Sequence, residues 1–73
     1  MSHSTHSARV ISPIPYTSAL GRAATIPPGP CLVEERDDAF VDVFWGRQGE
    51  RSAQLPRPAL EAAEQTGQLV LLD

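Results

Sequence analysis

The most regular alternation of hydrophobic and polar residues in this chain lies between residues 39 and 45. One set of alternating positions holds Ala39, Val41, Val43 and Trp45, and the other set holds Phe40, Asp42 and Phe44. Because successive side chains of a β-strand point to opposite faces, this pattern predicts a strand whose first face lies in a hydrophobic core. The aromatic pair on the second face is either partly covered by a curled sheet or left on the surface.

Shorter alternating segments flank this strand on both sides. Residues 31–36 form one strand candidate and residues 50–55 form another. The first two segments are separated by Asp37 and Asp38, whose carboxylates can accept hydrogen bonds from their own backbone. The second turn, at residues 46–49, has glycine at both ends, which suits a tight hairpin. Two successive hairpins predict an antiparallel meander.

The pattern changes after Pro56. Proline is well tolerated in the first turn of a helix, so residues 58–65 predict two helical turns that end at Gly67. Residues 68–72 are apolar enough to form a last strand that is buried on both faces. The result is a mainly β fold with one short helix before the last strand.

The first thirty residues lack this order. Residues 1–12 combine serine, threonine and histidine without periodicity, which predicts a disordered N-terminal arm. Residues 13–30 carry two proline clusters, and proline removes a backbone donor. This segment is therefore predicted to be extended, with an edge strand over residues 16–26 as an alternative. The folded unit is then residues 31–73.

Charge follows the same division. The chain has 73 residues and a net charge of −3, and all six of its cations are arginines. Residues 1–30 contain two arginines and no acidic residue, so residues 31–73 contain all nine acidic residues and carry a charge of −5. Nucleic-acid binding depends on the neutralisation of phosphates. Direct binding of nucleic acid is therefore not expected, whereas a basic protein surface suits this unit.

No group of residues has the spacing of a catalytic, metal or cofactor site, and we expect no cofactor. Cys31 is the only cysteine, which excludes an internal disulfide and a zinc cluster and fits a reducing cytoplasm. A thiol enzyme would need His3 or His6 as a base held within hydrogen-bond distance, and a disordered arm cannot hold one. A small enzyme that uses Cys31 is therefore the least favoured alternative.

The location of the protein is predicted from its hydropathy. No apolar run approaches the roughly 20 residues that cross a membrane. The first residues also lack the hydrophobic segment of a secretory signal. We therefore expect a cytoplasmic protein with no membrane partner.

Several of these segments together resemble a known fold family. Residues 40–45, the glycine turn, residues 50–55, the helix with Leu60 and residues 69–72 are similar to small SH3-like domains. One example is the C-terminal dimerisation domain of the KorB-type plasmid partition and repressor proteins. The resemblance implies a small SH3-like half-open antiparallel barrel that binds another protein chain. The chain lacks the helix-turn-helix of those repressors, so DNA reading is not implied.

The size of the folded unit also favours a binding role. Chains below about 40 residues usually need disulfides, metals or another chain in order to fold, and residues 31–73 are close to that limit. Either residues 16–26 or a partner chain must complete the core. In its size, its mobile N-terminal arm and its acidic core the chain is similar to small bacteriophage proteins that bind host machinery, notably bacterial RNA polymerase.

We therefore predict a non-enzymatic protein-binding module, encoded by a phage or another mobile element, that modulates a larger bacterial complex. The transcription machinery, and RNA polymerase in particular, is the expected partner. The alternative is a homodimerising SH3-like domain linked to plasmid or phage repression or partition. The residues expected to contact the partner are the acids near the first hairpin and the two remaining aromatics: Glu34, Glu35, Asp37, Asp38, Phe40, Asp42 and Phe44.

Overall fold

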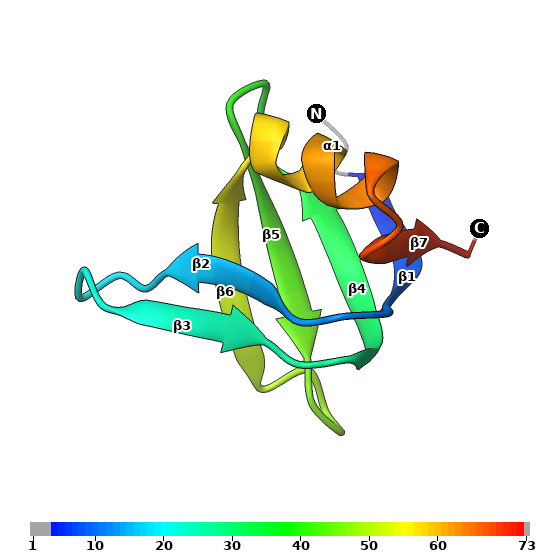
Figure 1. Ribbon diagram of the computed structural model, residues 1–73, viewed down its shortest axis with the longest axis horizontal. Helices are drawn as coiled ribbons and strands as arrows, with labels where there is room; N and C mark the ends of the chain where they lie inside the picture. The colour runs from blue at the N-terminus through cyan, green and yellow to red at the C-terminus, as the bar shows by residue number, and fades with distance from the viewer. Residues whose placement is uncertain (1–3, 73) are drawn as a thin grey trace.

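The computed structural model describes residues 4–72 and shows a mainly β domain with one short helix (Figure 1). The strands are β1 (Ser4–Val10), β2 (Ile14–Thr17), β3 (Ala23–Ile26), β4 (Gly29–Glu35), β5 (Phe40–Trp45), β6 (Arg51–Pro56) and β7 (Leu69–Leu71). The helix α1 is Arg57–Gln65. The predicted mainly β fold, with a helix before the last strand, is confirmed.

Five of these strands form one antiparallel sheet in the order β6-β5-β4-β1-β7. The strands β2 and β3 pair with each other as a separate hairpin. Figure 1 shows this hairpin crossing one face of the sheet and extending past β6, while α1 lies across one end of the sheet between β6 and β7. One face of the sheet is therefore covered, and we call it the inner face.

The inner face of the sheet carries the hydrophobic core. Its buried side chains are Ala8, Val10, Cys31, Val33, Val41, Val43, Trp45, Ala53, Leu55 and Leu69. Ile14 and Ile26 from the hairpin, and Leu60 and Ala63 from α1, belong to the same cluster. Every second residue of β5 is buried, as its alternation predicted. The hairpin and the helix complete the core that the meander alone could not close.

The predicted disordered arm over residues 1–12 is wrong from Ser4 to Val10. These residues form β1, which lies between β4 and β7 and pairs with both. The inward side chains of Ala8 and Val10 are each 1% exposed. Pairing of the backbone on two sides, with burial of these two side chains, offsets the entropy cost of ordering a polar segment. Residues 1–3 of the predicted arm lie outside the described residues.

Residues 13–30 also belong to the fold, so the predicted domain boundary at residue 31 is wrong. Two strands, β2 and β3, replace the single edge strand that was the alternative for residues 16–26. The turn between them contains Gly21, whose φ of 77° suits glycine. Pro15 lies in β2 and Pro30 lies near the start of β4, although the proline clusters were expected outside the sheet. Edge strands and strand starts are the positions at which a missing backbone donor is tolerated.

The meander and the helix follow the prediction closely. β4, β5 and β6 are successive antiparallel neighbours, and α1 ends where Gly67 has a φ of 80°. The N–H of Gly67 donates to the carbonyl of Glu64 (3.2 Å), and that of Gln68 donates to the carbonyl of Ala63 (2.9 Å). These two bonds satisfy the last carbonyls of the helix.

The last strand differs from its prediction. Only Leu69 of β7 is buried, whereas Val70 and Leu71 are 43% and 41% exposed. Val70 lies opposite Arg9 and points to the face of the sheet that neither the hairpin nor α1 covers, and no strand among residues 4–72 pairs with the second edge of β7. The expectation that this segment is buried on both faces is therefore wrong.

Candidate protein-binding surfaces

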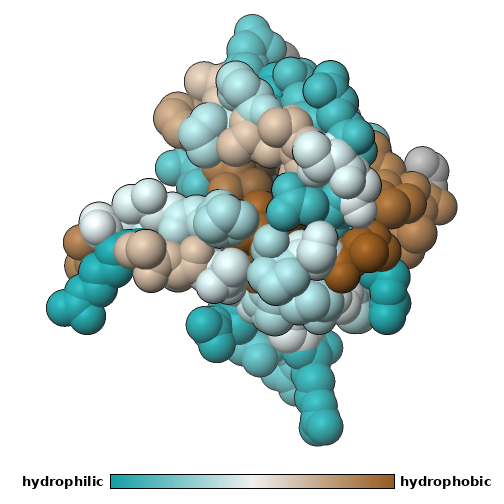
Figure 2. Space-filling model, viewed as in Figure 1, coloured by the Kyte–Doolittle hydropathy of each residue, from teal (hydrophilic) through white to brown (hydrophobic). Residues whose placement is uncertain are grey.

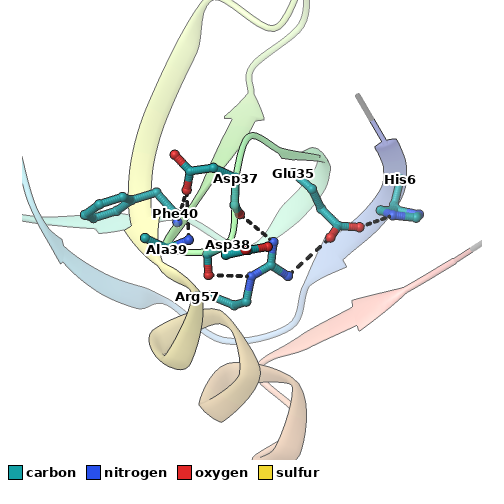
Figure 3. Close-up of polar contacts among 7 residues, drawn as sticks. All are labelled: His6, Glu35, Asp37, Asp38, Ala39, Phe40 and Arg57. Atoms are coloured by element: carbon teal, nitrogen blue, oxygen red, sulfur yellow. Dashed lines mark hydrogen bonds and ion pairs between the residues drawn. The ribbon is translucent and has the colours of Figure 1, made fainter. Parts of the chain in front are cut away.

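The acidic bend between β4 and β5 is held by one of its own side chains. Asp37 Oδ1 accepts the backbone N–H groups of Ala39 (2.8 Å) and Phe40 (2.9 Å) (Figure 3). This confirms the predicted turn and its mechanism. The same two hydrogen bonds hold the pKa of Asp37 below its ordinary value. Asp37 is thus part of the structure of the bend, whereas Asp38 is exposed.

Arg57, the first residue of α1, fastens this bend to the helix. Its Nε donates to the carbonyl of Asp38 (3.1 Å) and its Nη2 donates to the carbonyl of Asp37 (2.8 Å). Its Nη1 lies 3.2 Å from Glu35 Oε1. The backbone N–H of Arg57 donates to the carbonyl of Ala39 (2.8 Å). One arginine therefore fixes the position of the acidic bend relative to the core.

Glu35 joins the same network from β4. Its second oxygen, Oε2, lies 2.9 Å from Nε2 of His6 on β1. The hydrogen bond with His6, followed by that with Arg57, holds the pKa of Glu35 below its ordinary value. Both carboxylate oxygens are thus engaged within the fold. Glu35 acts as a structural bridge between β1, β4 and α1.

We expect the domain to lose stability when the pH falls below about 4. A carboxyl group with a depressed folded-state pKa stabilises the fold above its unfolded pKa, which is about 4.3 for Glu and 3.9 for Asp. That contribution is lost as the pH falls through the folded-state pKa. Urea unfolding near pH 7 and near pH 3 should show a larger loss for the parent than for Glu35→Gln. Equal losses would contradict the bridging role of Glu35, and Glu61→Gln, at an exposed position, is the control.

A groove runs between the hairpin and β6. One part of it, a hollow of about 400 Å³, is bordered by residues 16–19, Arg36, Asp42 and residues 52–54. The other part, of about 390 Å³, is bordered by residues 15–17, Phe40, residues 54–56 and Ala59. Tyr16, Thr17 and Gln54 border both hollows, so the two adjoin, and we call them together the hairpin groove. Figure 2 shows hydrophobic side chains between the projecting hairpin and the helix.

Phe40 lies on one wall of the hairpin groove. It is the first residue of β5, opposite Pro56 of β6, and it is 40% exposed. Figure 3 shows its ring pointing away from the Arg57 network. Tyr16 on β2 is held by an edge contact with Trp45, with ring centroids 6.1 Å apart and an interplanar angle of 74°. The groove therefore presents aromatic side chains that are fixed by the core or by a strand.

Strand β6 has one backbone edge, beside the groove, with which no strand pairs among residues 4–72. It is a terminal strand of the sheet, and the ladder bond between the N–H of Arg57 and the carbonyl of Ala39 fixes its phase against β5. Because hydrogen-bonded and non-bonded pairs alternate in an antiparallel ladder, the backbone groups of Ser52 and Gln54 point away from β5. Pro56 has the same orientation and has no N–H to leave unsatisfied.

The other predicted residues lie, together with Phe40, on the uncovered face of the sheet, which we call the outer face. Glu34 and Asp42 are opposite each other across β4 and β5. The carboxylate of Asp42 is paired with Arg36, with Nε and Oδ2 3.2 Å apart. The acidic character of this face therefore comes mainly from Glu34.

An apolar hollow lies next to these acids on the outer face. Leu32 and Phe44 are opposite each other in the ladder, and Leu32 is 44% exposed. Together with Leu72 and the turn at residues 46–49, they border a hollow of about 430 Å³. Phe44 is thus partly exposed on the outer face. This agrees with the alternative that leaves the second face of the strand on the surface.

The structure distributes the predicted contact residues over three places. Glu35 and Asp37 bond within the fold; Asp38 lies at the bend; Glu34, Phe40, Asp42 and Phe44 lie on the outer face, where Phe40 and Asp42 also border the hairpin groove. Neighbours along a strand point to opposite faces, which separates Glu34 from Glu35. The seven residues therefore do not form one surface.

Sequence reasoning missed four residues of these surfaces. Pro15, Tyr16 and Pro56 border the hairpin groove, and only the long-range placement of the hairpin beside β6 brings them together. Leu32 could have been found, because it alternates with two inward residues of β4.

Cys31 is buried, as expected for a small hydrophobic residue. Burial raises the pKa of its thiol, so the thiol keeps its proton near neutral pH and is a poor nucleophile. Within residues 4–72, no group of three or more His, Cys, Asp or Glu side chains is placed to hold a metal ion.

None of the helices in the described part of the chain is long and apolar enough to span a membrane. Comparisons with protein-family models, with curated proteins and with solved structures gave no match.

Proposed function

We propose that this protein is a non-enzymatic protein-binding module and that the hairpin groove takes a segment of the partner. The observation that carries the proposal is the position of Phe40, which is 40% exposed and borders a hollow that Tyr16 also borders. Aromatic side chains in concave, well-packed positions supply much of the binding energy of protein interfaces. Phe40 is therefore the side chain on which affinity should depend most.

The groove suits an extended polypeptide. The backbone groups of Ser52 and Gln54 can pair with alternate residues of an added strand. The hollows of about 400 and 390 Å³ on either side of Tyr16 leave room for side chains of that strand. Main-chain hydrogen bonds would then supply affinity, and the aromatic wall would supply selectivity.

The charge of the domain favours a basic segment. Asp38 is exposed beside the start of β5, and the chain as a whole carries a net charge of −3. Complementary charges near an interface raise the rate of association. Nucleic acid is a poor candidate because its binding requires neutralisation of phosphates.

We propose the bacterial transcription machinery as the larger complex, with RNA polymerase as the first candidate and a phage or other mobile element as the source. The chain would then act in the bacterial cytoplasm. The support for this choice is its similarity in size and acidity to small phage proteins that bind that enzyme. The SH3-like resemblance supports a binding role in general, because β4, β5, β6, α1 and β7 follow the order on which it rests.

We expect Asp38→Arg to slow association with RNA polymerase several-fold at low salt and to flatten its salt dependence, because charges at a rim act mainly on the association rate. Asp38 is preferred to Asp37, whose carboxylate holds the bend. Glu61→Arg makes the same change of charge at an exposed helical position outside the groove. Surface-binding kinetics at low and high salt measure both variants, and equal effects of the two would contradict a charge contribution from the bend.

We expect Phe40→Ala to raise the dissociation rate by at least about tenfold, because truncation of a central aromatic acts mainly on dissociation. Ile11→Ala is the control, since Ile11 is 52% exposed and does not border the groove. Circular dichroism checks that both variants fold. An unchanged dissociation rate for Phe40→Ala would remove the groove from the binding site.

A further inference from the structure

The outer face of the sheet carries its charged and apolar side chains in separate rows across the strands. The middle row consists of Leu72, Ser7, Leu32, Phe44 and Ser52. The row toward one end of the strands consists of Val70, Arg9 and Pro30. The row toward the other end consists of Thr5, Glu34, Asp42 and Gln54. Each row is therefore fixed by the strand register.

The middle row contains three apolar side chains, Leu72, Leu32 and Phe44, with Ser7 between the first two and Ser52 at its end. Leu32 is 44% exposed and Leu72 is 60% exposed, and both border the hollow of about 430 Å³ beside Phe44. Val70 of the neighbouring row is 43% exposed. Exposed apolar side chains that gather around a hollow and have polar neighbours are typical of an interaction surface.

The charges of the two outer rows are too far apart to neutralise each other within one chain. Arg9 lies opposite Pro30, and Pro30 is four residues from Glu34 along β4, which is about 13 Å at the usual rise of a strand. Neither Arg9 nor Glu34 takes part in an ion pair among residues 4–72. A cation and an anion therefore lie on opposite sides of an apolar row.

We infer that a second copy of this chain packs on the outer face, with a two-fold axis along the middle row. A rotation of 180° about that row places the apolar side chains of the two copies against each other. It also brings the row with Glu34 over the row with Arg9 of the second copy, at the spacing of about 10 Å typical of packed sheets. A two-fold axis parallel to the strands would instead place the row with Glu34 over the same row of the second copy. The like charges would then repel each other, so the charge pattern favours the axis along the middle row.

The self-complementary pattern favours a second copy over an unrelated protein. In a two-fold interface the same patch serves both chains, so it must carry both members of each contact. The outer face does so, with one apolar row between one basic and one acidic row. The dimer face adjoins the hairpin groove at Ser52, Asp42 and Gln54. Its main contacts, Leu32, Arg9 and Glu34, lie outside the groove, so the variants at these positions separate the dimer from partner binding.

The oligomeric state of the purified chain tests the inference. Sedimentation equilibrium of the full chain over a wide concentration range should fit a reversible dimer with twice the 7.9 kDa mass of one chain. Leu32→Ser should weaken the dimer at least about tenfold, because it removes an apolar contact that recurs in both copies. Leu32 is exposed in the single chain, so the variant should keep its fold by circular dichroism.

A charge swap tests the direction of the axis. Arg9→Glu should raise the dissociation constant at least about tenfold through like-charge repulsion. The double variant Arg9→Glu with Glu34→Arg should bring the dissociation constant back to within about threefold of the parent, because it recreates the opposite charges in exchanged positions. Arg22→Glu makes the same change of charge in the turn of the hairpin and should leave the dimer unchanged, as should Phe40→Ala.

Three results would overturn the inference. The first is a parent chain that stays monomeric up to about 1 mM. A dissociation constant above this concentration corresponds to a binding free energy weaker than about 4 kcal/mol. The second is a dimer that is insensitive to Leu32→Ser. The third is a dimer that Arg9→Glu weakens and the double variant does not restore. If the dimer is absent but Phe40→Ala still impairs partner binding, the proposed function stands without the dimer.

Discussion

Replacement of Val10 by aspartate is expected to prevent the chain from folding. The Val10 side chain is 1% exposed and belongs to the core cluster. An aspartate there would bury a carboxylate among apolar side chains, at a cost of more than about 4 kcal/mol. The whole free energy of unfolding of a domain of this length is on the order of 4–11 kcal/mol. The variant should therefore be largely unfolded at neutral pH.

Ile11→Asp is the matched control for Val10→Asp. The two positions are adjacent, both side chains are β-branched, and Ile11 is 52% exposed. Circular dichroism and urea unfolding should show a folded domain for Ile11→Asp and loss of the cooperative transition for Val10→Asp. If both variants fold with the stability of the parent, the N-terminal segment is not part of the sheet.

Truncation of Leu55 to alanine is expected to lower the free energy of unfolding by about 2–5 kcal/mol, the range typical of buried leucines. Leu55 is 2% exposed on the inner face of β6. Its loss would leave a cavity next to the residues of β5 and α1 that close this end of the core. In so small a domain this is a large part of the total stability.

Leu20→Ala removes the same atoms from an exposed position and provides the comparison. Leu20 is 83% exposed in the turn of the hairpin, so its truncation should change the free energy of unfolding by no more than about 0.5 kcal/mol. Urea unfolding monitored by Trp45 fluorescence measures both variants. Similar losses for the two would show that Leu55 does not lie in the core.

The strands with a strong local signal could be predicted from the sequence, and β1 could not. Val41, Val43 and Trp45 alternate over a whole strand, and the structure buries all three. In β1, only Ala8 and Val10 of seven residues are buried. Two inward positions in a polar segment do not distinguish a strand from a disordered arm, because the pairing with β4 and β7 that orders β1 is long-range.

The acidic bend was predictable, but the surfaces were not. The capping role of Asp37 depends on its own backbone neighbours, and local effects of this kind can be read from sequence. The grouping of Phe40 with Tyr16 depends on how the hairpin lies against β6. Contacts between residues so far apart in the chain leave no mark in a local pattern.

The central claim is that the hairpin groove binds a segment of a partner protein, and quantitative capture from a bacterial lysate tests it most directly. The immobilised parent, Phe40→Ala, Asp38→Arg and Ile11→Ala would be compared by mass spectrometry of the retained proteins. The account predicts that the parent and Ile11→Ala retain the same complex, with RNA polymerase subunits expected first, and that Phe40→Ala loses it. Retention of the same proteins in equal amounts by the parent and Phe40→Ala would contradict the claim.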